Sequence, residues 1–260
     1  MESSVRSRLR RRAGLVGVGA LSATGLAGLA LSTALGPAAV TRWSAVAGAA
    51  VCAGLVFLAA NLDRNRAVAG SVLRPRLGSA NLVTLARGTL LAWLAGFAVV
   101  PWQEGPLVAV PVALYAGNAA LDAVDGALAR RTGRVSNLGA RLDAEFDGAG
   151  VLVGLVVGVT AGLLPTILLL VGLVKYGYLA VEWLAVRGGR PLGPLPHRAS
   201  RRPLAALQML AVAVVLSTLL VPPAAALVAG GAGLAYVVGF VRDLRLRVVR
   251  RTDEYVDLVS

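Results

Sequence analysis

The chain of 260 residues contains one cysteine, one histidine and one lysine, and these scarcities exclude several kinds of site. Cys52 lies alone inside an apolar run, so neither an intrachain disulfide nor a cysteine metal site can form. His197 is the only histidine, which excludes zinc sites built from several histidines. Only 15% of the residues are charged and 5% aromatic, whereas 57% are hydrophobic. A soluble domain is more polar than this.

The net charge is +13, because 26 basic residues stand against 13 acidic ones. In a soluble protein such an excess would suggest a nucleic-acid partner. Here the cations cluster between apolar segments, as loop charges do in membrane proteins, and no platform of stacking aromatic residues accompanies them. We therefore exclude nucleic acid as a partner and expect a lipid bilayer around the chain.

Apolar segments recur along the chain at about the length needed to cross a bilayer, roughly 20 residues. Prolines such as Pro101 and Pro165 stand in the short turns between them, where a helix can stop at little cost. The pattern predicts an all-α integral membrane protein with eight spanning helices. Their predicted ranges are 13–35, 43–61, 80–100, 106–130, 140–162, 164–186, 203–221 and 223–241. The first apolar run is longer than that of a typical secretory signal, so we expect it to be retained.

The chain is predicted to divide into four parts. Residues 1–62 form a basic tail and two additional transmembrane helices with almost no polar chemistry. Residues 63–78 form a basic cytoplasmic linker, 79–242 a six-helix core, and 243–260 a basic cytoplasmic tail.

The distribution of arginine predicts the orientation in the membrane. Most of the cations lie in both tails, in the linker and in the segments 130–141 and 187–202, all on the same side of the predicted helices. Only Arg42 lies in a turn on the opposite side. Since basic loops stay cytoplasmic, we expect a multi-pass protein of the cell membrane with both termini and the loop 130–141 facing the cytoplasm.

Four aspartates stand at a spacing that a membrane helix has little reason to carry. Asp122 and Asp125 lie about 60° apart around one predicted helix, and Asp143 and Asp147 lie one turn apart on the next. A short loop makes the two helices antiparallel, so the two pairs can face each other near the cytoplasmic side. Carboxylates beside hydrocarbon are costly and usually mark a site.

Four adjacent carboxylates repel one another, so they must either take up protons or hold cations between them. Mg²⁺ and Mn²⁺ prefer oxygen ligands, and four carboxylates suit a two-metal site that serves displacement at phosphorus. Gly126 leaves room for a ligand to approach the helix, and Arg130 offers a planar cation suited to phosphate.

The pattern D-x2-D-G-x2-A-R-x8-G-x3-D-x3-D resembles the signature of the CDP-alcohol phosphotransferase family. Every fixed position is matched, by Asp122, Asp125, Gly126, Ala129, Arg130, Gly139, Asp143 and Asp147. The stretch Asn81-x-x-Thr84-x-x-Arg87 and the position of Ser136 also resemble family segments. The resemblance covers about 80–242, so the first two helices lie outside it.

The resemblance implies a role for each matched residue. Asp122, Asp125, Asp143 and Asp147 would hold two Mg²⁺ or Mn²⁺ ions, and Asp147 would also be the catalytic base that takes the proton of the acceptor hydroxyl. The cytidine diphosphate pocket would be lined by Gly126, Ala129, Arg130, Gly139, Asn81, Thr84, Arg87 and Ser136. The implied enzyme is a homodimer that transfers a phosphatidyl group from CDP-diacylglycerol to a polar alcohol and releases CMP.

The acceptor site is less well marked. Lys175 lies within a predicted span, where a charged residue suggests a site, although an ion pair with Glu182 explains it equally well. Arg198 and Arg201 lie in a basic segment that suits a phosphorylated acceptor, although ordinary positive-inside charge also explains them. The sequence does not determine which alcohol is the acceptor or which lipid tail the donor carries.

Two other functions fit part of the pattern. A transporter or channel with an intramembrane cation site explains the aspartates but not Gly126, Ala129 and Arg130 at fixed offsets. A membrane prenyltransferase also uses aspartate-rich helices and Mg²⁺. Such enzymes resemble the pattern N-D-x2-D-x3-D, whereas this chain has Ala129 at the position of the third aspartate.

Overall fold

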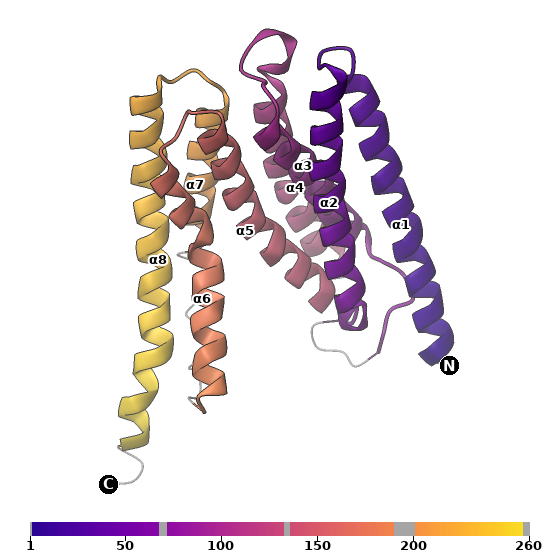
Figure 1. The fold of residues 1–260 in the computed structure, drawn as a ribbon. Helices are drawn as coiled ribbons and strands as arrows, with labels where there is room; N and C mark the ends of the chain where they lie inside the picture. The colour runs from indigo at the N-terminus through magenta and orange to yellow at the C-terminus, as the bar shows by residue number, and fades with distance from the viewer. Residues whose placement is uncertain (1, 68–71, 133–135, 190–200, 257–260) are drawn as a thin grey trace.

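Eight α-helices follow one another along the chain in the computed structural model, which describes residues 2–67, 72–132, 136–189 and 201–256 (Figure 1). The helices are α1 (Glu2–Leu31), α2 (Pro37–Asn61), α3 (Ser79–Gly96), α4 (Val110–Thr132), α5 (Asn137–Thr160), α6 (Leu169–Arg187), α7 (Arg201–Leu216) and α8 (Pro222–Val256). The predicted all-α architecture is confirmed.

Among the described residues, six helices are long and apolar enough to cross a membrane: α1, α2, α3, α4, α6 and α8. Helix α5 carries Asp143, Glu145 and Asp147 in its first half, and α7 has only 16 residues. These two helices complete a core of six helices, α3 to α8, which two further transmembrane helices precede. The protein is therefore an integral membrane protein.

Several helix ends differ from the predicted ones. Helix α1 begins at Glu2 rather than at 13, and α8 continues to Val256 rather than ending at 241. Apolar runs mark the part of a helix that lies in lipid, whereas arginine and leucine extend a helix into water without a break. Helix α7 ends before its predicted end at 221, and the chain then turns through Thr218, whose φ is 57°.

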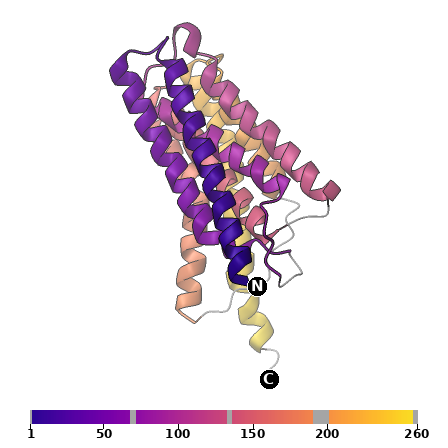
Figure 2. The same cartoon turned by 90° about the vertical axis from the view of Figure 1, so that its right-hand side faces the viewer.

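Helix α5 lies between two groups of helices (Figure 1). It packs against α3 on one side and against α6 and α7 on the other. Helices α1 and α2 pack on each other and on α3, and α8 packs on α6 and α7. Both chain ends lie at the same end of the bundle, which the view in Figure 2 also shows.

The described part of the segment 63–78 folds against the bundle. The Asn65 side chain is buried and donates to the carbonyl oxygens of Arg74 and Arg76, at 3.0 Å each. The backbone of Asn137 donates to the carbonyl oxygen of Arg66 at 3.0 Å. The segment therefore closes over the start of α5 instead of hanging free between two helices.

Helices α2 and α3 approach closely where Trp43 meets Gly96. The Trp43 side chain is buried and contacts Phe97 edge to face, with the ring centroids 6.2 Å apart. A methyl group on Gly96 would lie 2.5 Å from Trp43 Cδ1 and 2.6 Å from Nε1. Glycine at this position therefore allows the N-terminal pair to pack on the core.

We expect Gly96→Ala to destabilise the protein by about 1–3 kcal/mol, because the large indole cannot move away within a packed interface. Thermal unfolding in detergent checks this. Gly48→Ala on α2 is the matched control, since nothing lies within 4 Å of a methyl group there. Equal unfolding temperatures of the two variants would contradict the close approach.

Candidate functional site

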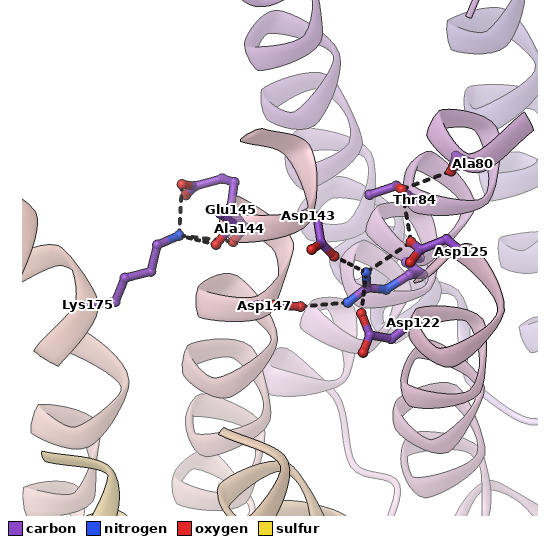
Figure 3. A network of polar contacts seen from close by, with 10 residues as sticks. Ala80, Thr84, Asp122, Asp125, Asp143, Ala144, Glu145, Asp147 and Lys175 are labelled. Atoms are coloured by element: carbon purple, nitrogen blue, oxygen red, sulfur yellow. Dashed lines mark hydrogen bonds and ion pairs between the residues drawn. The ribbon is translucent and has the colours of Figure 1, made fainter. Parts of the chain in front are cut away.

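Four aspartates from α4 and α5 converge on one guanidinium group from α3, that of Arg87 (Figure 3). Its Nη1 atom lies 2.7 Å from Asp122 Oδ1 and 3.1 Å from Asp125 Oδ2. The same atom lies 2.7 Å from Asp143 Oδ1, and Nη2 lies 2.8 Å from Asp147 Oδ1. The carboxylates of the two helices therefore face each other, as their spacing in the sequence predicts.

The cluster is closed at its base and open on one side. The Arg87 side chain is fully buried and that of Asp125 is 8% exposed, whereas the side chains of Asp122, Asp143 and Asp147 are 41–43% exposed. Thr84 holds the buried carboxylate, since its hydroxyl donates to Asp125 Oδ2 at 2.9 Å. A ligand can therefore reach three of the four carboxylates.

The charges of the cluster do not balance. One guanidinium faces four carboxylates, and among the side chains that the structure describes no other cation contacts them. Carboxylates this close to one another repel, and one guanidinium offsets only part of that repulsion. The surplus of negative charge therefore favours the binding of further cations.

The exposed carboxylates have the right chemistry for a divalent metal ion. Asp122, Asp143 and Asp147 each offer one oxygen, and these oxygens all lie within 4.8 Å of one another. Carboxylate oxygens are hard donors, which Mg²⁺ and Mn²⁺ prefer. The residues present therefore fit such an ion.

A second group of polar residues fixes the start of α5 beside the cluster. Ser136 accepts a hydrogen bond from the backbone nitrogen of Gly139 at 3.0 Å and so caps the helix. Asn81 of α3 donates to Ser136 Oγ at 3.2 Å and to Asn65 Oδ1 at 3.4 Å. A side chain on Gly139 would collide with the amide of Asn81, so this glycine allows α3 and α5 to approach.

Asn65 is the polar residue of this group that the sequence analysis did not single out. It is 1% exposed and joins the segment 63–78 to Asn81. A lone asparagine between arginines gives no pattern, so only the folded chain reveals its position.

Lys175 lies on the far side of α5 from the aspartates (Figure 3). Its Nζ atom is 2.9 Å from Glu145 Oε2 and donates to the carbonyl oxygen of Ala144 at 2.7 Å. Glu182 instead pairs with Arg247 of α8. An ion pair between Lys175 and Glu182 is therefore wrong.

The other predicted site residues lie partly outside the described structure. Gly126, Ala129 and Arg130 belong to α4, and Arg201 begins α7, but only their backbone is described. Arg198 lies outside the described residues.

A comparison with known protein families gives a match over most of the chain. The family model described as CDP-alcohol phosphatidyltransferase matches residues 77–241, which include all four aspartates and Arg87. The match covers the six core helices up to the middle of α8 and leaves α1 and α2 outside. No curated protein matches the chain.

We expect Arg87→Ala to lower the stability of the metal-free protein by about 3–5 kcal/mol, because it leaves four carboxylates without their buried counter-charge. Mn²⁺ should restore part of this loss. The stability of Arg87→Lys should lie between those of wild type and Arg87→Ala, since lysine keeps the charge but not the planar fork. Thermal unfolding with chelator and with Mn²⁺ measures both effects.

Arg42→Ala is the control for this experiment, because Arg42 is an exposed arginine distant from the cluster. An Arg87→Ala protein as stable in chelator as the Arg42→Ala protein would show that the guanidinium does not hold the cluster.

Proposed function

The chain belongs to the CDP-alcohol phosphatidyltransferase family, and from this premise we propose that it transfers a phosphatidyl group from CDP-diacylglycerol to the hydroxyl group of a polar alcohol, releasing CMP. The observation that carries the proposal is the convergence of Asp122, Asp125, Asp143 and Asp147 in a cluster open on one side. Transfer at phosphorus depends mostly on positioning and charge neutralisation, and such a cluster serves both.

The four aspartates would hold two Mg²⁺ or Mn²⁺ ions, which neutralise the charge of the pyrophosphate and of the departing CMP. Arg87 and Thr84 support this arrangement from beneath, since they fix the buried Asp125 from α3. Gly126, Ala129, Arg130 and Gly139 would bind the nucleotide, with Asn81, Thr84, Arg87 and Ser136 beside them.

Asp147 is our proposed general base. It contacts Arg87 through Nη2, whereas the other three aspartates share Nη1, so it stands at one edge of the cluster. A partly exposed carboxylate at the edge can accept the proton of an incoming hydroxyl while its neighbours hold the phosphates.

The acceptor would enter from the cytoplasmic side, which is the side on which the arginine distribution predicts both termini. Arg198 and Arg201 would attract a phosphorylated alcohol, and Lys175 is a weaker candidate because its amine is bound to Glu145. We propose a homodimer in the cell membrane, since small residues throughout the helices permit close packing between copies.

A transporter with an intramembrane cation site is the alternative function. The family match argues against it, because a transporter leaves the match of residues 77–241 to a phosphatidyltransferase family unexplained.

The function is tested by CMP release from CDP-diacylglycerol in detergent, with a panel of labelled alcohols as acceptors. The panel contains glycerol 3-phosphate, serine, inositol, inositol phosphate and a phospholipid with a free hydroxyl. We expect CMP and one labelled lipid product in Mn²⁺ or Mg²⁺, and neither product after chelation, because the pyrophosphate charge is then not neutralised. Full turnover in chelator would contradict the metal-dependent proposal, and a transporter would release no CMP.

We expect Asp147→Asn to reduce turnover by at least about a hundredfold, the usual contribution of a general base, while CDP binding stays largely intact. CMP release and binding of labelled CDP in Mn²⁺ measure the two effects. Glu104→Gln, in an exposed turn, is the control and should change neither. Equal loss of binding and turnover in Asp147→Asn would mean that Asp147 anchors metal and does not take the proton.

A further inference from the structure

The guanidinium of Arg87 lies at the position that a metal ion held by aspartates of both α4 and α5 would take. Its Nη1 atom is 2.7 Å from Asp122 Oδ1 and 2.7 Å from Asp143 Oδ1, between the carboxylates of the two helices (Figure 3). A divalent ion on these two oxygens needs the same place, since Mg²⁺ lies about 2.1 Å from its oxygen ligands. The nitrogen and the ion therefore compete for the same carboxylates.

The guanidinium is not paired with these carboxylates in the way that arginine usually is. Arginine binds a carboxylate best through two parallel N–H bonds, whereas here each aspartate contacts a single nitrogen. The two N–H bonds of Nη1 donate to Asp125 and Asp143, so Asp122 is held by charge alone. The buried Nε atom has no hydrogen-bond partner among the described residues. A spherical cation has no N–H directions to satisfy, so it suits converging carboxylates better than this nitrogen does.

The contacts of Arg87 divide into a buried anchor and three exposed contacts. Asp125 is 8% exposed, and its Oδ2 atom accepts from Thr84 at 2.9 Å and from Arg87 at 3.1 Å. No described residue donates to its Oδ1 atom. The other three aspartates are half-exposed. An ion that enters from the open side can therefore take the exposed carboxylates from Arg87 without breaking the buried bond.

The cluster needs a cation even when no metal ion is bound. Four bare carboxylates from α4 and α5 would repel one another and push the two helices apart. Arg87 contacts all four from α3 and supplies one positive charge at their centre. The metal-free site is therefore held in an arrangement that an ion can enter.

We propose that Arg87 is an internal substitute for the metal. It holds the four aspartates together in the metal-free protein and releases Asp122, Asp143 and Asp147 when Mg²⁺ or Mn²⁺ binds, while its bond to Asp125 persists. This inference rests on the metal site of the proposed function. Because each ion has to displace the guanidinium, Arg87 lowers the apparent affinity of the site by the fraction of time that the site is free of it.

The first test measures Mn²⁺ binding without substrate, by the electron paramagnetic resonance signal of free Mn²⁺, on wild type and Arg87→Gln in detergent. Glutamine is neutral and keeps a polar group beside Asp125. If the guanidinium holds its position at least about nine-tenths of the time, its removal tightens binding at least about tenfold, and this is the result we expect. If Arg87 served only to shape the metal site, its loss would weaken Mn²⁺ binding instead.

Arg141→Gln is the matched control. Arg141 is exposed, lies on α5 two residues before Asp143, and contacts none of the aspartates in the described structure. The variant loses the same charge, but water and salt screen that charge, so Mn²⁺ affinity should change less than about twofold at physiological ionic strength. Equal tightening in both variants would reduce the effect to net charge and overturn the inference.

The second test is an experimental structure of wild type with Mn²⁺ bound, which does not depend on the folding of a variant. We expect Nη1 beyond hydrogen-bond distance of Asp122 and Asp143 but still bonded to Asp125. An ion on these aspartates beside an unmoved guanidinium would overturn the inference.

The two proposals fail in different ways. If wild type binds Mn²⁺ and Arg87→Gln binds it no more tightly, the substitute role of Arg87 is wrong and the proposed function stands. If wild type neither binds Mn²⁺ nor releases CMP, the proposed function is wrong, and this inference with it.

Discussion

The site depends on one electrostatic constraint, the need to hold four carboxylates together at the side of a membrane bundle. A single buried guanidinium cannot neutralise them, yet it binds all four and so fixes α3, α4 and α5 relative to one another. Removing one partner of a buried charge group costs far more than the group contributes when complete. The arrangement is therefore stable only as a unit, and its remaining negative charge attracts cations.

The surrounding structure serves this unit. The Ser136 cap and the close approach of Gly139 to Asn81 set where α5 begins, and Asp143 and Asp147 lie on its first turns. Asn65 extends the same hydrogen-bond network into the segment before α3. Each of these contacts is local, but together they fix the start of α5, and with it Asp143 and Asp147, against α3.

The fold class and the aspartate cluster could be predicted from the sequence, because both depend on spacing alone. Apolar runs of membrane length gave the eight helices, and helical periodicity placed Asp143 above Asp147. The resemblance places Arg87 in the nucleotide pocket, but its contact with all four aspartates could not be predicted, since a long side chain can reach in several directions and only packing selects one. The pairing of Lys175 with Glu145 shows the same limit, as periodicity along α6 favoured Glu182 and the neighbouring α5 supplied the partner. The helix ends at Glu2 and Val256 were not predicted, because hydropathy marks only the part of a helix that lies in the membrane and not its extension into water.

Phe146 shows how the N-terminal helices and the proposed chemistry are connected. Its ring lies so close to Gly88 of α3 that a methyl group there would be 2.5 Å from it, and a methyl group on Gly54 of α2 would lie 4.0 Å from it. The next residue in α5 is Asp147. A side chain larger than methyl on Gly54 would therefore press on the ring, and the ring belongs to the residue directly before Asp147. Close-packed interiors transmit such strain because they contain little free space. Helix α2 is consequently part of the environment of Phe146 beside Asp147, although the family model that identifies the core does not include this helix.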